Sequence, residues 1–141
     1  MGSVDMFVDG PTKACISGDG YHRTECGGTH QWMMVDLGQA RKLNLNHYAL
    51  RHGRDNSDYA LTTWELQGAE TVDGPWTTLR RHDNDRSLPA QPRATAAWAV
   101  ENSGEFFRVF RIVLGERGNR GGTNNFLHCS GIELYGGLLE E

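Results

Sequence analysis

The sequence is short of cysteine, of positive charge and of long hydrophobic runs, and each shortage excludes a class of protein. No apolar run approaches the roughly 20 residues of a membrane-spanning helix, and no apolar signal-peptide core follows Met1. The cysteines, Cys15, Cys26 and Cys129, are odd in number, whereas a secreted domain usually pairs its cysteines. We therefore expect reduced thiols, an intracellular and cytoplasmic location, no membrane partner, and Cys129 as a small core residue.

The charge balance and the motifs argue against nucleic-acid binding and against catalysis. The formal net charge is −4, whereas broad nucleic-acid binding needs a basic face. The glycine-rich segment 115–122 lacks the Lys-Ser/Thr ending of a phosphate loop. The pairs His82-Asp83 and His128-Cys129 are sequence neighbours, and along a strand such neighbours point to opposite faces. We predict a non-catalytic domain that binds no cofactor.

A metal site near the N-terminus is a weaker interpretation of the same sequence. Four nitrogen and sulfur side chains stand close enough in sequence to share a zinc ion: Cys15, His22, Cys26 and His30. Their spacing matches none of the strong zinc-finger patterns. Asp9 and Asp19 alone fall short of the six to eight oxygen ligands that calcium takes. We predict that the domain holds no metal.

The stretch 59–82 carries the clearest structural pattern. Trp64 and Leu66 alternate with polar residues, and a period of two is typical of a strand with one buried face. Residues 70–75 then supply an Asp-Gly pair for a tight reversal, and the apolar run 76–79 returns along the first. A short helix beginning at Trp64 is the competing interpretation, but a glycine interrupts it. We predict a hairpin that anchors a β core.

Other segments of strand length follow the same logic. They cover residues 32–37, 42–51, 97–100, 106–114 and 131–135. The apolar parity slips between Leu45 and Tyr48, which indicates either a β-bulge or a late start of the strand. Residues 106–114 are the most apolar run, which predicts a central strand. Residues 1–31 show no period and are predicted to be a long ordered loop region, with residues 1–3 typical of an expression scar.

These patterns predict one all-β domain over residues 1–141, an antiparallel β-sandwich or jelly roll. The polar segment 83–95 is a connection within it. The inward-facing strand positions give the predicted core: Trp32, Val35, Leu37, Leu50, Trp64, Leu66, Trp76, Leu79, Trp98, Phe110, Ile112, Ile132 and Leu134.

The order of these motifs resembles the galactose-binding-like family, the discoidin or coagulation-factor C-type domains. The resemblance covers about residues 30–136. It lies in Trp32 with VDLG at 35–38, in the hairpin 64–79, in FRVFRI ending at Ile112, and in IELYG at 132–136. The forms YALRHGRDNSDYALTTWELQG and LRRHDND look most like the intracellular members attached to BTB adaptors and HECT-type ubiquitin ligases. Extracellular members usually close the sandwich with a disulfide whose second cysteine follows ELYG. Here that place is Gly137.

In this family, ligands meet loops at one end of the sandwich. Carried onto this sequence, those loops are residues 18–30, 52–58 and 115–125. Their candidate partner-binding residues are Tyr21, His22, Arg23, Arg54, Asp55, Asn56, Asp58, Arg117, Asn119, Arg120, Asn124 and Asn125. Arginine forks recognise carboxylates and asparagine amides match peptide or hydroxyl groups, although loops are also polar simply because water surrounds them.

The resulting hypothesis is a binding module of a larger intracellular protein. Its loops would present a site to a protein or peptide partner, an acidic one in particular, within a ubiquitin-ligase assembly. The alternative is a carbohydrate-binding module using the same loops. Sugar sites usually show an exposed aromatic platform, and these loops offer only Tyr21 and Phe126.

Overall fold

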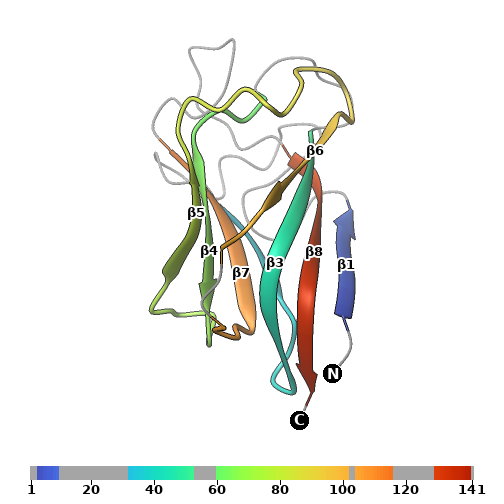
Figure 1. Ribbon diagram of the computed structural model, residues 1–141. Helices are drawn as coiled ribbons and strands as arrows, with labels where there is room; N and C mark the ends of the chain where they lie inside the picture. Colours follow the sequence, from blue (N-terminus) through green and yellow to red (C-terminus); the bar gives the residue numbers. More distant parts are fainter. Residues whose placement is uncertain (1–2, 10–31, 53–59, 102–103, 116–128, 141) are drawn as a thin grey trace.

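The computed structural model describes residues 3–9, 32–52, 60–101, 104–115 and 129–140 of the chain. These residues form eight strands (Figure 1): β1 Ser3–Asp9, β2 Trp32–Asp36, β3 Arg41–His52, β4 Trp64–Ala69, β5 Thr77–His82, β6 Thr95–Ala99, β7 Val109–Leu114 and β8 Cys129–Glu140. Within the described ranges no helix is long and apolar enough to cross a membrane.

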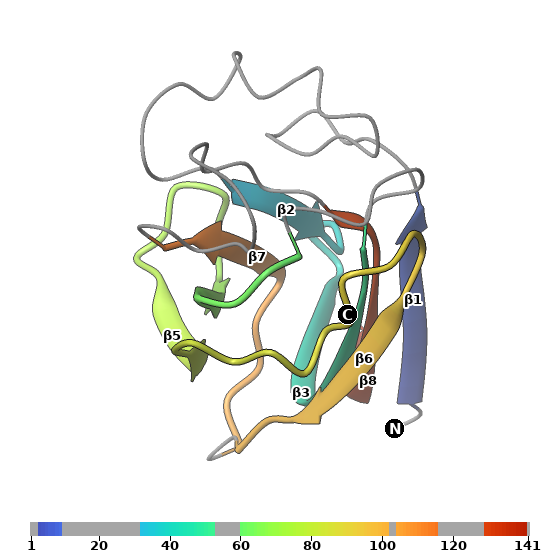
Figure 2. The ribbon, with the colours of Figure 1, turned by 90° about the horizontal axis from the view of Figure 1, so that it is seen from above.

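The strands form two four-stranded sheets that pack face to face (Figures 1 and 2). One sheet has the order β1-β8-β3-β6 and the other β2-β7-β4-β5, and every registered pair of strands is antiparallel. The predicted all-β sandwich is therefore confirmed, with β7 in a central position between β2 and β4. Edge strands of the two sheets are joined where Arg80 Nη1 donates to the Ala99 carbonyl at 2.6 Å.

The predicted hairpin is confirmed as β4 and β5. Its register pairs Trp64 with His82, and the alternation along β4 places Trp64 and Leu66 in the core. In the turn, Gly74 has a φ of +84°, a conformation that side chains other than glycine rarely adopt. The Gly74 N–H donates to the Thr71 carbonyl at 3.1 Å, which closes the reversal.

Of the two interpretations of the parity slip in β3, the bulge is confirmed, and it accounts for a glycine of the closing strand. Leu45 pairs with Gly136, and His47 pairs with the residue just before Gly136, so Asn46 is skipped in the ladder with β8. A Cβ atom on Gly136 would lie 2.0 Å from the Asn44 carbonyl oxygen. The close approach of the two backbones at the bulge therefore requires glycine at this position.

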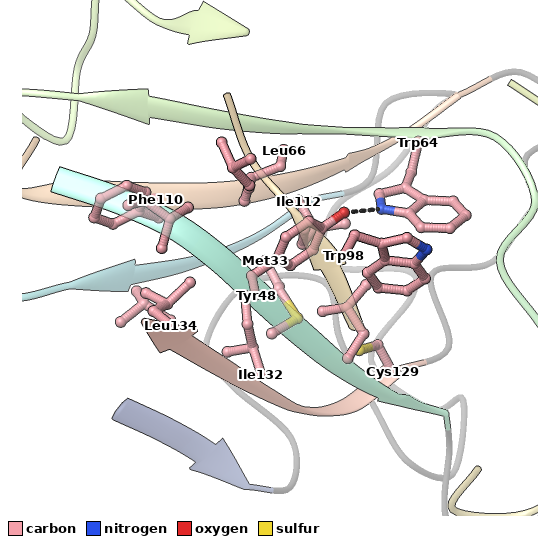
Figure 3. Close-up of a cluster of buried hydrophobic side chains, with 14 of the residues drawn as sticks. Met33, Tyr48, Trp64, Leu66, Trp98, Phe110, Ile112, Cys129, Ile132 and Leu134 are labelled. Carbon is pink, nitrogen blue, oxygen red and sulfur yellow. Dashed lines mark hydrogen bonds between the residues drawn. The ribbon is translucent and has the colours of Figure 1, made fainter. Parts of the chain in front are cut away.

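The core lies between the two sheets and contains most of the predicted residues (Figure 3). The confirmed set is Val35, Leu37, Leu50, Trp64, Leu66, Trp98, Phe110, Ile112, Ile132 and Leu134. Burial was wrongly predicted for Trp32, Trp76 and Leu79, which are only partly buried. Trp32 is three positions from Val35, so strand alternation places it on the opposite face and Met33 takes the inner position. Trp76 precedes β5, and Leu79 packs against the margin of the core.

The prediction of an irregular segment over residues 1–31 is wrong for residues 3–9, which form β1. This strand pairs with β8 in seven steps, from Ser3 opposite Gly137 to Asp9 opposite Gly131. Main-chain groups make the bonds of an antiparallel ladder, so pairing of this kind needs no distinctive side-chain pattern. Ser3 takes part in the ladder although it falls in the expected expression scar.

Candidate functional site

Described residues next to the three loops indicated by the family resemblance lie at one end of the sandwich, the upper end in Figure 1. His52 lies opposite Cys129 in one sheet, and Trp32 lies opposite Val113, two residues before Gly115, in the other. The starts of β3 and β7 meet at the other end, through a bridge between residues 43 and 107.

All of the predicted binding residues lie outside the described residues: Tyr21, His22, Arg23, Arg54, Asp55, Asn56, Asp58, Arg117, Asn119, Arg120, Asn124 and Asn125. The predicted patch of Arg54, Arg117 and Arg120 stays a prediction. It requires the flanks of their loops to share one end of the sandwich, and His52 and Gly115 do.

Directly beneath this end lies a buried group of rings, Tyr48, Trp64, His82 and Trp98, which we call the aromatic cluster. The Trp64 and His82 rings are stacked, with centroids 3.9 Å apart and an interplanar angle of 10°. Trp98 meets Trp64 edge-on at 5.3 Å and His82 edge-on at 4.9 Å, and Tyr48 lies 5.1 Å from Trp98. Figure 3 shows three of these rings converging between the sheets. Such packing fixes the position of each ring.

A chain of hydrogen bonds runs through the aromatic cluster to Asp85. Trp64 Nε1 donates to the Tyr48 hydroxyl at 3.0 Å, and that hydroxyl lies 2.5 Å from His82 Nε2. His82 Nδ1 lies 2.7 Å from the Asp85 carboxylate. Because an ionised carboxylate only accepts, we assign the imidazole proton to Nδ1, and the Tyr48 hydroxyl then donates to Nε2. In this neutral tautomer both nitrogens of His82 are satisfied.

Burial sets the charge states along this chain. Desolvation lowers the pKa of His82 in spite of the neighbouring Asp85, so the neutral ring is favoured. Desolvation also raises the pKa of Tyr48 well above its usual value. For Asp85, burial alone would raise the pKa, but hydrogen bonds from Ser87 and His82 outweigh it and lower the pKa. The carboxylate therefore stays ionised beside a neutral imidazole.

The chain from Asp85 through His82 to Tyr48 has the connectivity of a catalytic triad, but it is buried. The exposed fraction is 0% for Tyr48 and 2% for His82. An activated nucleophile needs access to substrate and a lowered pKa, whereas the pKa of Tyr48 is raised. The network therefore orients rings under the end of the sandwich and supplies no nucleophile.

Cys129 is buried at the start of β8, in the same sheet as Tyr48 and Trp98. Its thiol donates to the Gly131 carbonyl at 3.4 Å, and burial raises its pKa to about 11. The predicted role of Cys129 as a core residue is confirmed. The residues of the weaker zinc interpretation, Cys15, His22, Cys26 and His30, lie outside the described residues, and within the described part no three His, Cys, Asp or Glu side chains gather as a metal site.

Sequence reasoning missed the network of Tyr48, His82 and Asp85. In the sequence analysis, His82 was considered only as a possible catalytic pair with its neighbour Asp83, which is exposed. The usable signal was the spacing: a histidine at the end of a strand with an aspartate three residues later can meet it across a turn. Tyr48 gave no such signal, because only the packing of the two sheets brings β3 next to β5.

Comparison with known proteins tests the fold. No family model matches the sequence. Chitosan-binding module 1 of a chitosanase/glucanase from Paenibacillus sp. IK-5 is 12% identical, with a TM-score of 0.51 and 95% of each chain covered. The family 32 carbohydrate-binding module of C. perfringens NanJ, solved with galactose, is 11% identical, with a TM-score of 0.51, covering 94% of this chain and 93% of that one. The chain has the galactose-binding-like fold. At these identities the likeness establishes the fold alone.

Two curated relatives are similar in sequence, and both are ubiquitin ligases. E3 ubiquitin-protein ligase hecd-1 of Caenorhabditis elegans is 39% identical over 95 residues, 66% of this chain. E3 ubiquitin-protein ligase Ufd4 of Drosophila melanogaster is 38% identical over 112 residues, 77% of this chain. The expected resemblance to domains of ubiquitin ligases is confirmed. The chain spans only 3% and 4% of the length of these relatives.

Proposed function

We propose that this galactose-binding-like domain is a non-catalytic module of an intracellular ubiquitin ligase, whose loop end binds a protein or peptide partner. The observation that carries the proposal is the shared end of the sandwich. Segments holding Arg54, Arg117 and Arg120 are flanked there by His52 and Gly115.

The described residues support a preorganised site at this end. Gly115 N–H donates to the Thr63 carbonyl at 3.0 Å, and His52 N–H donates to the Ala94 carbonyl at 2.8 Å, so both loop flanks are held by backbone bonds. The aromatic cluster lies under them with its polar atoms paired. A rigid base lowers the entropic cost of presenting loops to a partner.

The test is capture of partners from cell lysate with three forms of the domain. The wild type is compared with the triple variant Arg54→Ala, Arg117→Ala and Arg120→Ala. Arg41→Ala is the control, because Arg41 is an exposed arginine at the opposite end. We expect the triple variant to fold normally but lose the captured partners, with each lost charge-assisted bond costing roughly 1.5–3 kcal/mol. Equal capture by the triple variant would refute the proposal.

A carbohydrate ligand is the second candidate, favoured by the two carbohydrate-binding modules that share the fold. A glycan array separates the two candidates. Binding of the domain to a defined glycan that is lost in the triple variant would establish the carbohydrate reading, whereas an empty array together with captured protein supports the proposal.

A further inference from the structure

A groove of about 530 Å³ with mixed polar and apolar lining lies at the outer face of β4, β5 and β7 and reaches Trp64, His82 and Leu114 at the end of this sheet. Its volume falls in the range of ligand pockets. Side chains that line its outer-face portion are Thr63, Glu65, Gln67, Arg81, Arg111 and Val113.

Arg111 is the central cation of the groove, and its contacts in the described part of the chain are with neutral side chains. Its Nε donates to Gln67 Oε1 at 2.7 Å, and its guanidinium lies 3.9 Å from the centroid of the Trp76 ring. Among the described residues no carboxylate forms an ion pair with Arg111. The guanidinium N–H groups of Arg111 that these contacts do not use are well placed to donate to a carboxylate of a binding partner.

Glu65 is the carboxylate of the groove, and a hydrogen bond from Thr78 together with the nearby charge of Arg81 helps to lower its pKa. It accepts from Thr78 Oγ1 at 2.7 Å and from Gln67 Nε2 at 3.2 Å. Arg81, which is exposed, lies opposite Glu65 in the strand register. Strand spacing and rise place the Cα atoms of Arg81 and Arg111 about 12 Å apart. Two guanidinium groups therefore share the groove with one carboxylate.

The same face continues over β2 with large apolar side chains. Trp32 pairs with Val113 and Met34 pairs with Arg111, so both lie on the outer face. Both are partly exposed, as is Trp76. Tryptophan, methionine and arginine are enriched at protein interfaces, and tryptophan and arginine are frequent among the residues that dominate binding energy.

From this face we infer a second binding surface, which takes an extended acidic segment of a partner protein. Every second side chain of the segment would face the sheet, and these inward side chains would include carboxylates that pair with Arg111 and Arg81 and apolar groups that pack on Trp32 and Trp76. An extended peptide alternates its side chains in this way. A flat sugar is a poorer fit, since the guanidinium of Arg111 already covers one face of Trp76. This surface uses none of the proposed loop residues, so the two proposals fail independently.

The experiment is an NMR titration with an acetylated, amidated heptapeptide, Glu-Ser-Leu-Ser-Glu-Ser-Leu, which carries glutamate and leucine on one face when it is extended. The chain has four tryptophans, whose indole N–H signals report on the outer face through Trp32 and Trp76 and on the core through the other two. We expect the peptide to shift the two outer-face signals and to leave the buried pair nearly unchanged. The matched peptide with lysine in place of glutamate should shift neither.

Variants then test whether Arg111 and Arg81 bind the carboxylates of the peptide. Arg111→Gln and Arg81→Gln should each weaken peptide binding about tenfold or more, as loss of a charge-assisted bond does. Arg41→Gln makes the same charge change outside the groove and should bind like the wild type. Arg81 is exposed, so its variant keeps the test valid if Arg111→Gln folds poorly. Absence of outer-face shifts at millimolar peptide, equal shifts with the lysine peptide, or wild-type affinity in Arg81→Gln would each overturn the inference. Outer-face shifts produced by chitohexaose or galactose alone would also overturn it.

Discussion

Replacing Tyr48 by phenylalanine tests the buried network beneath the loop end. The substitution removes one oxygen from a side chain with no exposed surface and leaves the ring in place. That oxygen accepts from Trp64 Nε1 at 3.0 Å and lies 2.5 Å from His82 Nε2. Tyr48→Phe therefore deprives two buried nitrogens of their partner in one step.

The expected loss of stability follows from those two groups. Leaving a buried polar group unsatisfied costs about 1–3 kcal/mol, and the variant no longer has to desolvate its own hydroxyl. We expect the free energy of unfolding to fall by about 2–4 kcal/mol. Tyr135→Phe is the matched control. It removes the same hydroxyl from the partly exposed side chain of Tyr135, which bonds to Glu133, and should cost less than about 1 kcal/mol.

The assay is urea unfolding followed by tryptophan fluorescence. An unchanged dependence on urea concentration would show that only stability differs between the variants. If Tyr48→Phe and Tyr135→Phe lose equal stability, or if Tyr48→Phe loses less than about 0.5 kcal/mol, the assigned hydrogen-bond chain is incorrect. NMR of the His82 ring provides a second reading, because the tautomer with its proton on Nδ1 should be detected in the wild type.

Four further predictions concern stability and thiols. Trp64→Ala should cost about 3–5 kcal/mol, and wild-type thermal stability in this variant would contradict the hairpin's role in the core. The folded pKa of His82 lies below its unfolded value of about 6.5. The unfolded chain therefore takes up the proton first, and stability should fall as pH drops below about 6.5, with a shallower fall in His82→Gln. Gly136→Ala should cost at least about 1–3 kcal/mol, because its Cβ would meet backbone, and a freely tolerated alanine would argue against the bulge. Thiol counting in denaturant without reductant should find all three cysteines reduced, and a count of one would indicate a disulfide.

Much of this fold could be predicted because strands with one buried face repeat every two residues. The hairpin 64–82 combined alternation with an Asp-Gly turn, and the slip at Leu45 marked the bulge. Trp32 was misplaced because hydrophobicity alone does not say which face a residue takes. The outer face of the sheet that contains β2 also carries large apolar side chains. In this sheet the core residues are therefore identified by their alternate positions along a strand and not by their hydrophobicity. Residues 3–9 gave no signal, since their pairing with β8 depends on main-chain groups.

The candidate site was less predictable, for a different physical reason. Loop composition and the family resemblance indicated which end of the sandwich to examine, and the strand register agrees at His52 and Gly115. The groove residues Arg81 and Arg111 come from strands 30 positions apart in sequence. Arg111 meets Trp76 only because a single strand, β4, separates β7 from β5 in the sheet. Such a site depends on strand order, which a single sequence does not contain.

The pairing of β1 with β8 joins the two ends of the described chain within one sheet, where the family resemblance implies a disulfide for extracellular members. Gly137 occupies the place of the second cysteine, and it lies directly opposite Ser3 at one end of the β1–β8 ladder. A disulfide there would contribute typically 2–4 kcal/mol. Each backbone hydrogen bond contributes a net 0.5–1.5 kcal/mol or so, so a few bonds of the ladder reach the same range. Unlike a disulfide, the ladder does not depend on redox potential. Closure by main-chain pairing is therefore the arrangement expected of a module that works in a reducing compartment, as proposed for this domain.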